Sequence, residues 1–418
     1  MFTLAATPAV AAKRKGGLLV KYILLSLLVA SAGAMAVFAG HASGSPEVPA
    51  GVSSGRSAPP FWLLMTREGP SPRGSHAVAW DAARGRIVLF GGDGMMDGRV
   101  ESLGDTWEWD GSTWHRAATT GPSPRESHAM TYDITRARTV LFGGETETSG
   151  DDFVSLGDTW EWDGTQWHHV ASAGPQSRQG HAMVYDAARG VTVLFGGSAD
   201  DDGDDVVLGD TWTWNGSQWQ QAHVSGPAAR VLHAMAYDSL RQRVVLYGGW
   251  SGSVPLGDTW EWDGAQWQQV SLAGPSVRAL HAMTYDSTRG VTVLFGGAGV
   301  PAGAFTLLED TWEWDGTQWT QVGTIAAPSP RGRPAMAFDG ARARTLLFGG
   351  FTAVEFIHGF ESFARDTWEF GTREPVFPPE IAETLLGQRA LPVLERFLLG
   401  DRNADRIWDA ADLLPPVR

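Results

Sequence analysis

The sequence contains no cysteine, and its only lysines lie near the N-terminus. Without cysteine, the 418-residue chain forms no disulfide, no thiolate zinc site and no cysteine nucleophile. The three lysines are Lys13, Lys15 and Lys21. Without these and Arg14, 28 basic residues remain against 47 acidic residues, a net charge of about −19. Because nucleic-acid binding needs a basic surface, this composition argues against a nucleic-acid partner.

The sequence does contain one motif repeated six times, a glycine doublet followed after a variable gap by Asp-Thr-Trp. The doublets begin at Gly91, Gly143, Gly196, Gly248, Gly296 and Gly349. The Asp-Thr-Trp units begin at Asp105, Asp158, Asp210, Asp258, Asp310 and Asp366. Successive doublets lie 48 to 53 residues apart. A period near ~50 residues with four strand-like segments per unit is typical of a β-propeller blade.

The second unit illustrates the expected strands. His128–Tyr132 and Arg138–Phe142 are apolar segments of strand length, and the doublet ends the second of them. Thr159–Trp162 is the third expected strand and Gln166–Val170 the fourth. Between them, Asp163-Gly164 predicts a tight hairpin, because glycine adopts positive φ without steric cost. Such a sheet is too small to bury its aromatic face alone, so neighbouring sheets must stack.

The two ends of the repeat region predict ring closure. The sixth unit ends near Gly371 without a fourth strand, whereas Phe61–Met65 at the start matches one. Trp62 aligns with a tryptophan that recurs in the other units. These are Trp114, Trp167, Trp219, Trp267 and Trp319. We therefore predict that the N-terminal strand completes the last blade.

These motifs resemble the kelch-repeat β-propeller family over residues 61–372. The related architecture is the galactose-oxidase-like central domain, and the resemblance implies an all-β, six-bladed kelch β-propeller. WD40 repeats are a poorer match, because they are shorter, at ~40–45 residues, and lack the glycine doublet. Some galactose-oxidase-like members use a copper-radical site with a Tyr–Cys cross-link. The absence of cysteine excludes that cofactor here.

The N-terminal residues predict export. Basic residues precede an uncharged stretch at 22–40 that is rich in Leu, Val and Ala, as in a signal peptide or a signal anchor. Residues 1–42 are therefore interpreted as one or the other, and residues 43–60 as a flexible linker. The localisation expected is extracellular, periplasmic or at the cell surface. The membrane is expected as a partner only through this hydrophobic segment.

The C-terminal tail, residues 373–418, predicts a short helical region over 385–399 followed by an acidic loop. That loop resembles one half of a dockerin module, and the resemblance implies Ca²⁺ binding. The implied ligands are Asp401, Asn403, Asp405, Ile407, Asp409 and Asp412. Arg406 stands where a calcium loop has glycine, and only one such loop is present. An acidic helix cap is the alternative, and docking to a cohesin the less favoured extension.

Two further residues recur in the connecting loops. The recurring histidines are His76, His128, His181, His233 and His281, with Pro334 in the sixth unit. The recurring arginines are Arg73, Arg125, Arg178, Arg230, Arg278 and Arg331. They are candidates for anion-binding or acid–base groups around the channel. A structural role is favoured, such as a bond between each arginine and the Asp of Asp-Thr-Trp, because every blade has them.

Function is expected where the blades differ, in the loops between the second and third strands. Acidic residues gather in the first three units and aromatic residues in the last three. The candidate binding face comprises Asp97, Asp151, Asp201, Trp250, Phe305, Phe351, Phe356 and Phe360. Exposed aromatic groups beside acids suit a protein or glycan partner. Alternatively, the acids keep long loops soluble and the phenylalanines fold inward.

The sequence thus predicts an exported, non-catalytic propeller that binds a protein or carbohydrate through its blade loops. No catalytic constellation stands out from the repeats. The alternatives are a sugar-active kelch enzyme, of mutarotase, oxidase or hydrolase type, and a cell-surface structural spacer. An enzyme would need the recurring His and Arg to converge on an open pocket. The sequence indicates no oligomeric state.

Overall fold

The repeated sequence folds into repeated four-stranded antiparallel sheets. The computed structural model describes residues 60–96, 98–148, 152–201, 204–300, 306–324, 327–355 and 360–372. Within these ranges the regular secondary structure is entirely β, as the sequence predicts, and includes six four-stranded sheets. We number the sheets in chain order and give their strands from the innermost outward.

The first three sheets follow the expected pattern. Sheet 1 comprises β2 (Ala77–Asp81), β3 (Arg86–Phe90), β6 (Thr106–Trp109) and β7 (Trp114–Ala118). Sheet 2 comprises β8 (Ala129–Asp133), β9 (Arg138–Phe142), β12 (Thr159–Trp162) and β13 (Trp167–Ala171). Sheet 3 comprises β14 (Ala182–Asp186), β15 (Val191–Asp201), β16 (Asp204–Trp214) and β17 (Trp219–Ala222).

The last three sheets repeat this strand order, except that the outermost strand of sheet 6 is β1. Sheet 4 comprises β18 (Ala234–Asp238), β19 (Arg243–Trp250), β20 (Pro255–Trp262) and β21 (Trp267–Ser271). Sheet 5 comprises β23 (Ala282–Asp286), β24 (Val291–Phe295), β27 (Thr311–Trp314) and β28 (Trp319–Val322). Sheet 6 comprises β29 (Ala335–Asp339), β30 (Arg344–Phe348), β33 (Thr367–Gly371) and, outermost, β1 (Phe61–Thr66).

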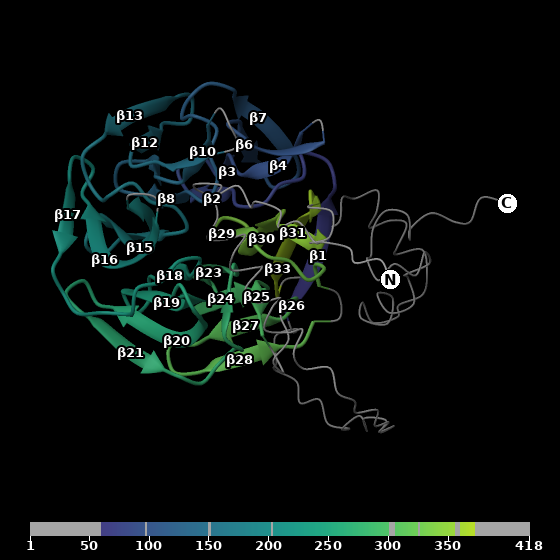
Figure 1. Cartoon of the computed structure of the whole chain (residues 1–418). Helices are drawn as coiled ribbons and strands as arrows, with labels where there is room; N and C mark the ends of the chain where they lie inside the picture. The colour runs from purple at the N-terminus through teal and green to yellow at the C-terminus, as the bar shows by residue number, and fades with distance from the viewer. Residues whose placement is uncertain are drawn as a thin grey trace, which may run out of the picture.

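The first strand of the chain therefore pairs with the last, as predicted. Phe61 lies opposite Gly371, and Trp62 lies opposite Phe370. Each innermost strand contacts that of the next sheet, and β29 in turn contacts β2, so the sheets form a closed ring around an axis (Figure 1). The pairing of β1 with β33 fastens this ring.

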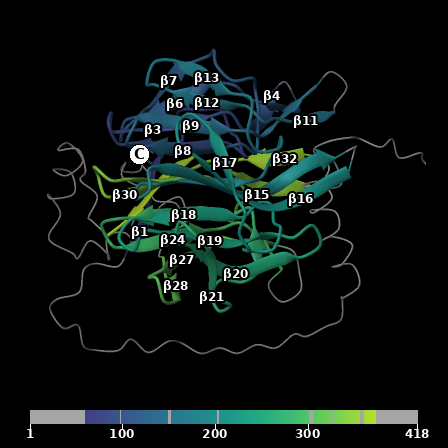
Figure 2. The ribbon, with the colours of Figure 1, turned by 90° about the vertical axis from the view of Figure 1, so that its left-hand side faces the viewer.

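Short additional hairpins extend the second-to-third-strand connections. They are β4 (Asp93–Met96) with β5 (Arg99–Ser102), β10 (Glu145–Glu147) with β11 (Phe153–Ser155), and β31 (Phe351–Glu355) with β32 (Phe360–Phe363). In sheet 5, β25 (Ala298–Gly299) pairs with β26 (Thr306–Leu307) and with β22 (Arg278–Ala279). In sheets 3 and 4 the long central strands make the extension themselves. These hairpins gather on one side of the ring, which we call the loop face (Figure 2).

The hairpin between the third and fourth strands is a four-residue turn. In sheet 2, Trp162 lies opposite Trp167, and Asp163 through Gln166 form the connection. Gly164 has φ +98°, the conformation that its position predicts. The Asp163 carboxylate accepts hydrogen bonds from the backbone N–H groups of Thr165 and Gln166 at 2.8 and 2.9 Å. The aspartate thus holds the turn closed, which explains the recurrence of Asp-Gly.

The core lies between sheets rather than within one. Between sheets 1 and 2, for example, Phe90 packs edge-on against Trp167 with ring centroids 5.3 Å apart. The indole of Trp167 donates a hydrogen bond to Thr106 of sheet 1 at 2.9 Å. Equivalent Trp–Thr bonds cross all six sheet boundaries. The other five are Trp219–Thr159, Trp267–Thr211, Trp319–Thr259, Trp62–Thr311 and Trp114–Thr367, at 2.8 to 2.9 Å.

Several predicted segments fall outside the described residues. These are the signal or anchor segment 1–42, almost all of the linker 43–60, and the helical tail 373–418. In the ranges that are described, we find no helix with the length and apolarity to cross a bilayer.

Removing the closing strand tests this architecture. We expect deletion of Phe61–Thr66 to lower the Tm by at least about 10 °C, because loss of a buried Trp62 side chain alone costs about 3–5 kcal/mol. Differential scanning calorimetry gives the Tm. The control is Leu272→Ser, which changes an exposed apolar residue outside the core. A deletion variant that melts with the control would contradict closure by β1.

Candidate functional site

The recurring arginines tie strands together, as predicted. Arg73 is fully buried, and its Nη1 donates to the Gly91 carbonyl at 2.9 Å and to Asp105 Oδ1 at 2.7 Å. Its Nη2 donates to Asp105 Oδ2 at 3.1 Å, so the contact is bidentate. The other five pairs are Arg125–Asp158, Arg178–Asp210, Arg230–Asp258, Arg278–Asp310 and Arg331–Asp366, with Nη1–Oδ1 distances of 2.6 to 2.8 Å. These guanidinium groups are occupied and do not form an anion-binding ring.

The aspartate of Asp-Thr-Trp has a second partner. Asp105 Oδ2 also accepts a hydrogen bond from Trp107 Nε1 at 2.7 Å, and all six sheets repeat this bond. Partial burial raises the pKa of Asp105, but the hydrogen bonds and charge of Arg73 outweigh it, so the net pKa is lowered. The carboxylate is therefore ionised and committed to the fold.

The glycine doublet is required by the next sheet. Gly91 and Gly92 have φ of +63° and +98°. The N–H of Gly92 donates to the carbonyl of Arg125, in the following sheet, at 2.9 Å. A Cβ at Gly91 would lie 2.6 Å from that carbonyl, and one at Gly92 would lie 2.4 Å from the Gly74 carbonyl. No larger residue fits, so the doublet is structural.

The recurring histidines form a collar around the axis on the loop-face side. They line a cavity of about 120 Å³ together with Pro334 and Arg333. Each ring packs edge-on against an aromatic residue, as His181 does against Phe142 with centroids 5.5 Å apart. Burial, and then the charge of Arg178, lowers the pKa of His181 to about 3. The same causes, with the neighbouring arginine in each sheet, lower the pKa of the other four.

The collar is held together by backbone bonds from sheet to sheet. The residue before each collar position has positive φ, and its N–H donates to the carbonyl of its counterpart in the preceding sheet. These bonds are Ser127–Ser75, Gly180–Ser127, Leu232–Gly180, Leu280–Leu232 and Arg333–Leu280, at 2.8 to 3.0 Å. Where the sixth sheet meets the first, the Arg333 guanidinium bonds the Ser75 hydroxyl. The histidines therefore converge on this cavity, and in the described part of the chain their buried ring nitrogens have no hydrogen-bond partner. Their lowered pKa values keep them neutral, which favours a structural role over acid–base catalysis.

The loop face places two of the predicted aromatic residues in the interior. Trp250 and Phe351 are each 3% exposed, where the sequence analysis expected an exposed surface. They pack in one apolar cluster with Val231 and Leu232, from the connection that leads into sheet 4, and with Leu280, from the connection that leads into sheet 5. This is the inward folding that the alternative interpretation proposed, and its cause is contact between sheets 4, 5 and 6. A binding role for the remainder of this face stays a prediction.

The other predicted residues lie in strands or outside the described residues. Asp201 and Phe360 are placed as members of β15 and β32 only. Asp97, Asp151, Phe305 and Phe356 lie outside the described residues. So do all six candidate calcium ligands, from Asp401 to Asp412. In the ranges that are described, no group of three or more His, Asp or Glu side chains has the arrangement to hold a metal ion.

Buried acids lie at the first two hairpins, and exposed apolar residues, which the sequence did not predict, lie on the first four. Glu126 is buried beside Asp93 and Glu145; burial, then the charges of those two carboxylates, raises its pKa well above the usual value. Each of the first four hairpins also carries one exposed apolar residue. These are Met96, Val154, Val206 and Val254, between 40% and 54% exposed. Met96, Val154 and Val206 have acidic neighbours in the sequence, whereas Val254 has none, so no shared sequence signal marks the four.

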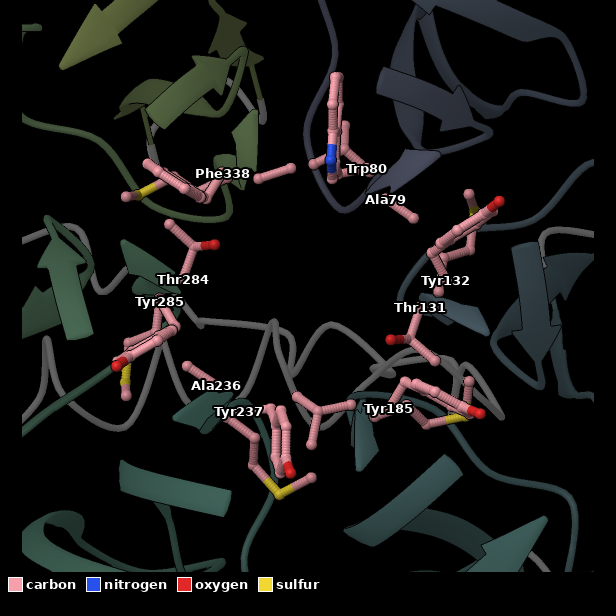
Figure 3. Close-up of a pocket in the computed structure, with 18 of the residues that line it drawn as sticks. Ala79, Trp80, Thr131, Tyr132, Tyr185, Ala236, Tyr237, Thr284, Tyr285 and Phe338 are labelled. Carbon is pink, nitrogen blue, oxygen red and sulfur yellow. The ribbon is translucent and has the colours of Figure 1, made fainter. Parts of the chain in front are cut away.

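The opposite end of the axis opens into a wider mouth, which we call the turn-face mouth. It has a volume of about 310 Å³ and is ringed by one aromatic residue from each sheet (Figure 3). These are Trp80, Tyr132, Tyr185, Tyr237, Tyr285 and Phe338. The Tyr185 hydroxyl donates to Thr135 of the preceding sheet at 2.7 Å, and the Tyr237 hydroxyl accepts from the Ala188 N–H at 3.1 Å.

The collar predicts a pH dependence of stability. The pKa of His181 is about 3 when folded and about 6.5 when unfolded, so the unfolded chain binds more protons between these values. Stability is therefore complete above pH 6.5 and is lost as pH falls, by at most about 1.4 kcal/mol per pH unit for each histidine. Glu126 and Glu369 act in the opposite direction, because their raised pKa values make the folded chain bind protons first as pH falls. They offset the destabilising effect of at most two of the five histidines.

Urea unfolding between pH 7.5 and 4.5 measures this effect. We expect the free energy of unfolding to fall as pH is lowered across this range. The slope of this free energy against pH reports the difference in bound protons, and we expect His181→Gln to reduce that difference by about one proton. His223→Gln, at an exposed position, is the control and leaves the slope unchanged. The slope is the readout, so any general loss of stability does not confuse the result. A flat profile for the unmodified protein would show that the collar is not held neutral.

Comparison with known proteins identifies the repeat. The chain matches the family described as the KLHDC2/KLHL20/DRC7 Kelch-repeats domain over residues 28–215 and 138–350. A solved structure, entitled "Structure of YjhT", superposes with a TM-score of 0.56 over 72% of this chain and 95% of that one. At 16% identity, this similarity shows the fold alone.

Two relatives come from Chlamydomonas reinhardtii. The chain is 28% identical over 194 residues to the dynein alpha chain of the flagellar outer arm, covering 42% of this chain and 4% of that one. It is 33% identical over 100 residues to dynein regulatory complex subunit 7, and this match covers 20% of this chain and 8% of that one. The chain thus spans only a small part of either relative. The family match exceeds half of the sequence, and with the glycine doublets and the ring of sheets it shows that this chain belongs to the Kelch-repeat family.

Proposed function

We propose that this chain is an exported, non-catalytic propeller of six blades that binds a protein partner through its loop face. The observation that carries the proposal is the set of exposed apolar residues near the tips of the first four hairpins. Kelch repeats suggest a protein-interaction propeller, and isolated apolar groups on projecting hairpins provide contacts that a partner can bury. The recurring arginines and aspartates are committed to the fold, which leaves these hairpins as the variable surface.

The charge of the hairpins favours a basic partner surface. Exposed carboxylates accompany the apolar tips, among them Glu101, Asp152 and Asp200. The chain as a whole carries a formal charge of −15. Opposite charges around an interface accelerate association and orient the partner, and salt weakens that contribution. The partner we propose therefore presents basic side chains around an apolar centre.

The positions of the first and last described strands favour the loop face as the partner surface. β1 begins at Phe61 and β33 ends at Gly371, and these two residues pair at the end of sheet 6 opposite the loop face. An N-terminal signal anchor, if retained, would therefore join the ring on the side away from the hairpins. The loop face would then point away from the membrane.

The relatives' names support a role in assembly. One is named as a subunit of a dynein regulatory complex and the other as a chain of a flagellar outer arm. Both names describe proteins that work within larger complexes. By analogy, we propose that this chain contributes a protein contact rather than an enzymatic step.

An affinity experiment with the full chain tests the proposal. The loop variant replaces the four apolar tip residues with serine: Met96→Ser, Val154→Ser, Val206→Ser and Val254→Ser. We expect at least about ten-fold lower recovery of bound proteins, because four partly buried contacts supply well over the 1.4 kcal/mol that a factor of ten requires. Quantitative mass spectrometry of the captured proteins gives the measurement, at low and high salt, with and without calcium.

The matched control carries serine at two exposed apolar residues in the turns opposite the loop face, Ile134 and Leu240. We expect this control to retain the partner, and raised salt to weaken capture by the unmodified chain. Equal capture by all three proteins would contradict the loop face as the binding surface. Binding to a glycan array instead would favour the carbohydrate alternative. A calcium-dependent partner that is lost in Asp405→Asn would assign binding to the acidic loop of the tail.

A further inference from the structure

The turn-face mouth lies at the other end of the axis and is apolar. Small residues reach toward its centre, and Thr131 and Thr284 face each other across the opening (Figure 3). Burial, and then the neighbouring Asp81, raises the pKa of Tyr132 to about 12, so its hydroxyl is uncharged. The aromatic ring and the small residues together form a pocket of a size that accepts several large side chains.

The charged groups around this mouth are engaged in ion pairs with one another. In each sheet, the aspartate that ends the innermost strand pairs with an arginine three residues later. The pairs are Asp81–Arg84, Asp133–Arg136, Asp186–Arg189, Asp238–Arg241, Asp286–Arg289 and Asp339–Arg342, at 2.6 to 2.7 Å. In five of the sheets the same arginine also pairs with a glutamate of the third strand, as Arg84 does with Glu108 at 2.7 Å. These charged groups are engaged with one another, and the lining of aromatic and small residues suits an apolar occupant.

The rim is also apolar and uncovered by the described residues. Ile134 lines the mouth and is 58% exposed, and Leu240 in the corresponding turn of sheet 4 is 78% exposed. We take the mouth, with Ile134 and Leu240 in the turns at its side of the ring, as the candidate docking surface. Large exposed apolar residues around an open pocket mark a surface that another segment covers.

The chain leaves the ring on this same side. Phe338 of the mouth pairs with Thr345, and Thr345 pairs with Phe370, so β33 ends at the level of the mouth. Two strand spacings separate β33 from the innermost strand β29, a distance of about 10 Å. Residues 373–381 can extend about 30 Å. The segment that follows is therefore within reach of the mouth.

The following segment has the composition to fill it. Residues 381–399 contain Ile381, Leu385, Leu386, Leu391, Val393, Leu394, Phe397, Leu398 and Leu399. The linker at 43–60, which enters on the same side, contains no leucine, isoleucine or aromatic residue. We propose that residues 381–399 dock their apolar side chains in the turn-face mouth and cover Ile134 and Leu240. This docking concerns the face opposite the proposed partner surface and is independent of it.

The absence of cysteine allows a direct test. A single Thr284→Cys substitution places one thiol in the mouth, and its reaction rate with 5,5′-dithiobis(2-nitrobenzoate) reports access. We expect labelling to be at least about ten-fold slower in the full chain than in a chain that ends at Thr372, because a tethered segment acts at about millimolar effective concentration. A peptide of residues 381–399, added to the shortened chain, restores protection. Leu394→Ser with Phe397→Ser in the full chain removes it.

Ser253→Cys is the matched control, because Ser253 is exposed on the loop face. Its labelling rate stays the same in all these proteins, and calorimetry verifies that each one is folded. Equal Thr284→Cys rates in the full and shortened chains would overturn the proposal. Protection that persists in the shortened chain would also overturn it. The same holds for protection that rises with protein concentration, which would indicate a second copy, and for protection that is lost when residues 1–59 are removed.

Discussion

The fold depends on one buried arginine in each sheet. Its side chain joins two strands of its own sheet, through the doublet carbonyl and the aspartate of Asp-Thr-Trp. Its own backbone carbonyl accepts a hydrogen bond from the glycine doublet of the preceding sheet, as Arg73 does from Gly350 at 2.9 Å. One residue therefore sets both the geometry within a sheet and the spacing between sheets. Burial of a guanidinium is costly unless its N–H groups are paired, and these contacts pair them.

This arrangement determines where function is possible. The arginines, aspartates and glycine doublets are committed to the ring, and the histidine collar is buried and neutral. The charged groups that recur in every sheet are thus unavailable to a ligand, and the charged groups that remain differ from sheet to sheet. The two ends of the axis differ in character, one carrying acidic and apolar hairpins and the other an uncharged aromatic mouth. A partner at one end and a segment of the chain at the other would not compete.

The repeats predicted the fold well, because identical local rules act in every unit. The Asp-Gly hairpins, the pairing of Phe61–Thr66 with the last strand and the bond from Arg73 to Asp105 follow from spacing and residue type. The exposure of the loop residues did not follow. Trp250 is buried by Val231, from its own sheet's connection, and by residues of sheets 5 and 6, so its environment depends on contacts distant in sequence. Met96 and Val254 have ordinary apolar side chains, and only the structure shows that they project into solvent.

The buried arginine gives the most direct test of the central claim. In Arg178→Met, Asp210 and the carbonyl of Gly196 lose a donor that no water molecule can easily replace. We predict that equilibrium urea denaturation at pH 7.5 shows a loss of about 3–5 kcal/mol in the free energy of unfolding. The comparison is Arg365→Met, whose exposed pairing with Glu68 at 3.5 Å is worth less than about 1 kcal/mol. If the two variants lose the same free energy, the arginine does not hold the ring together.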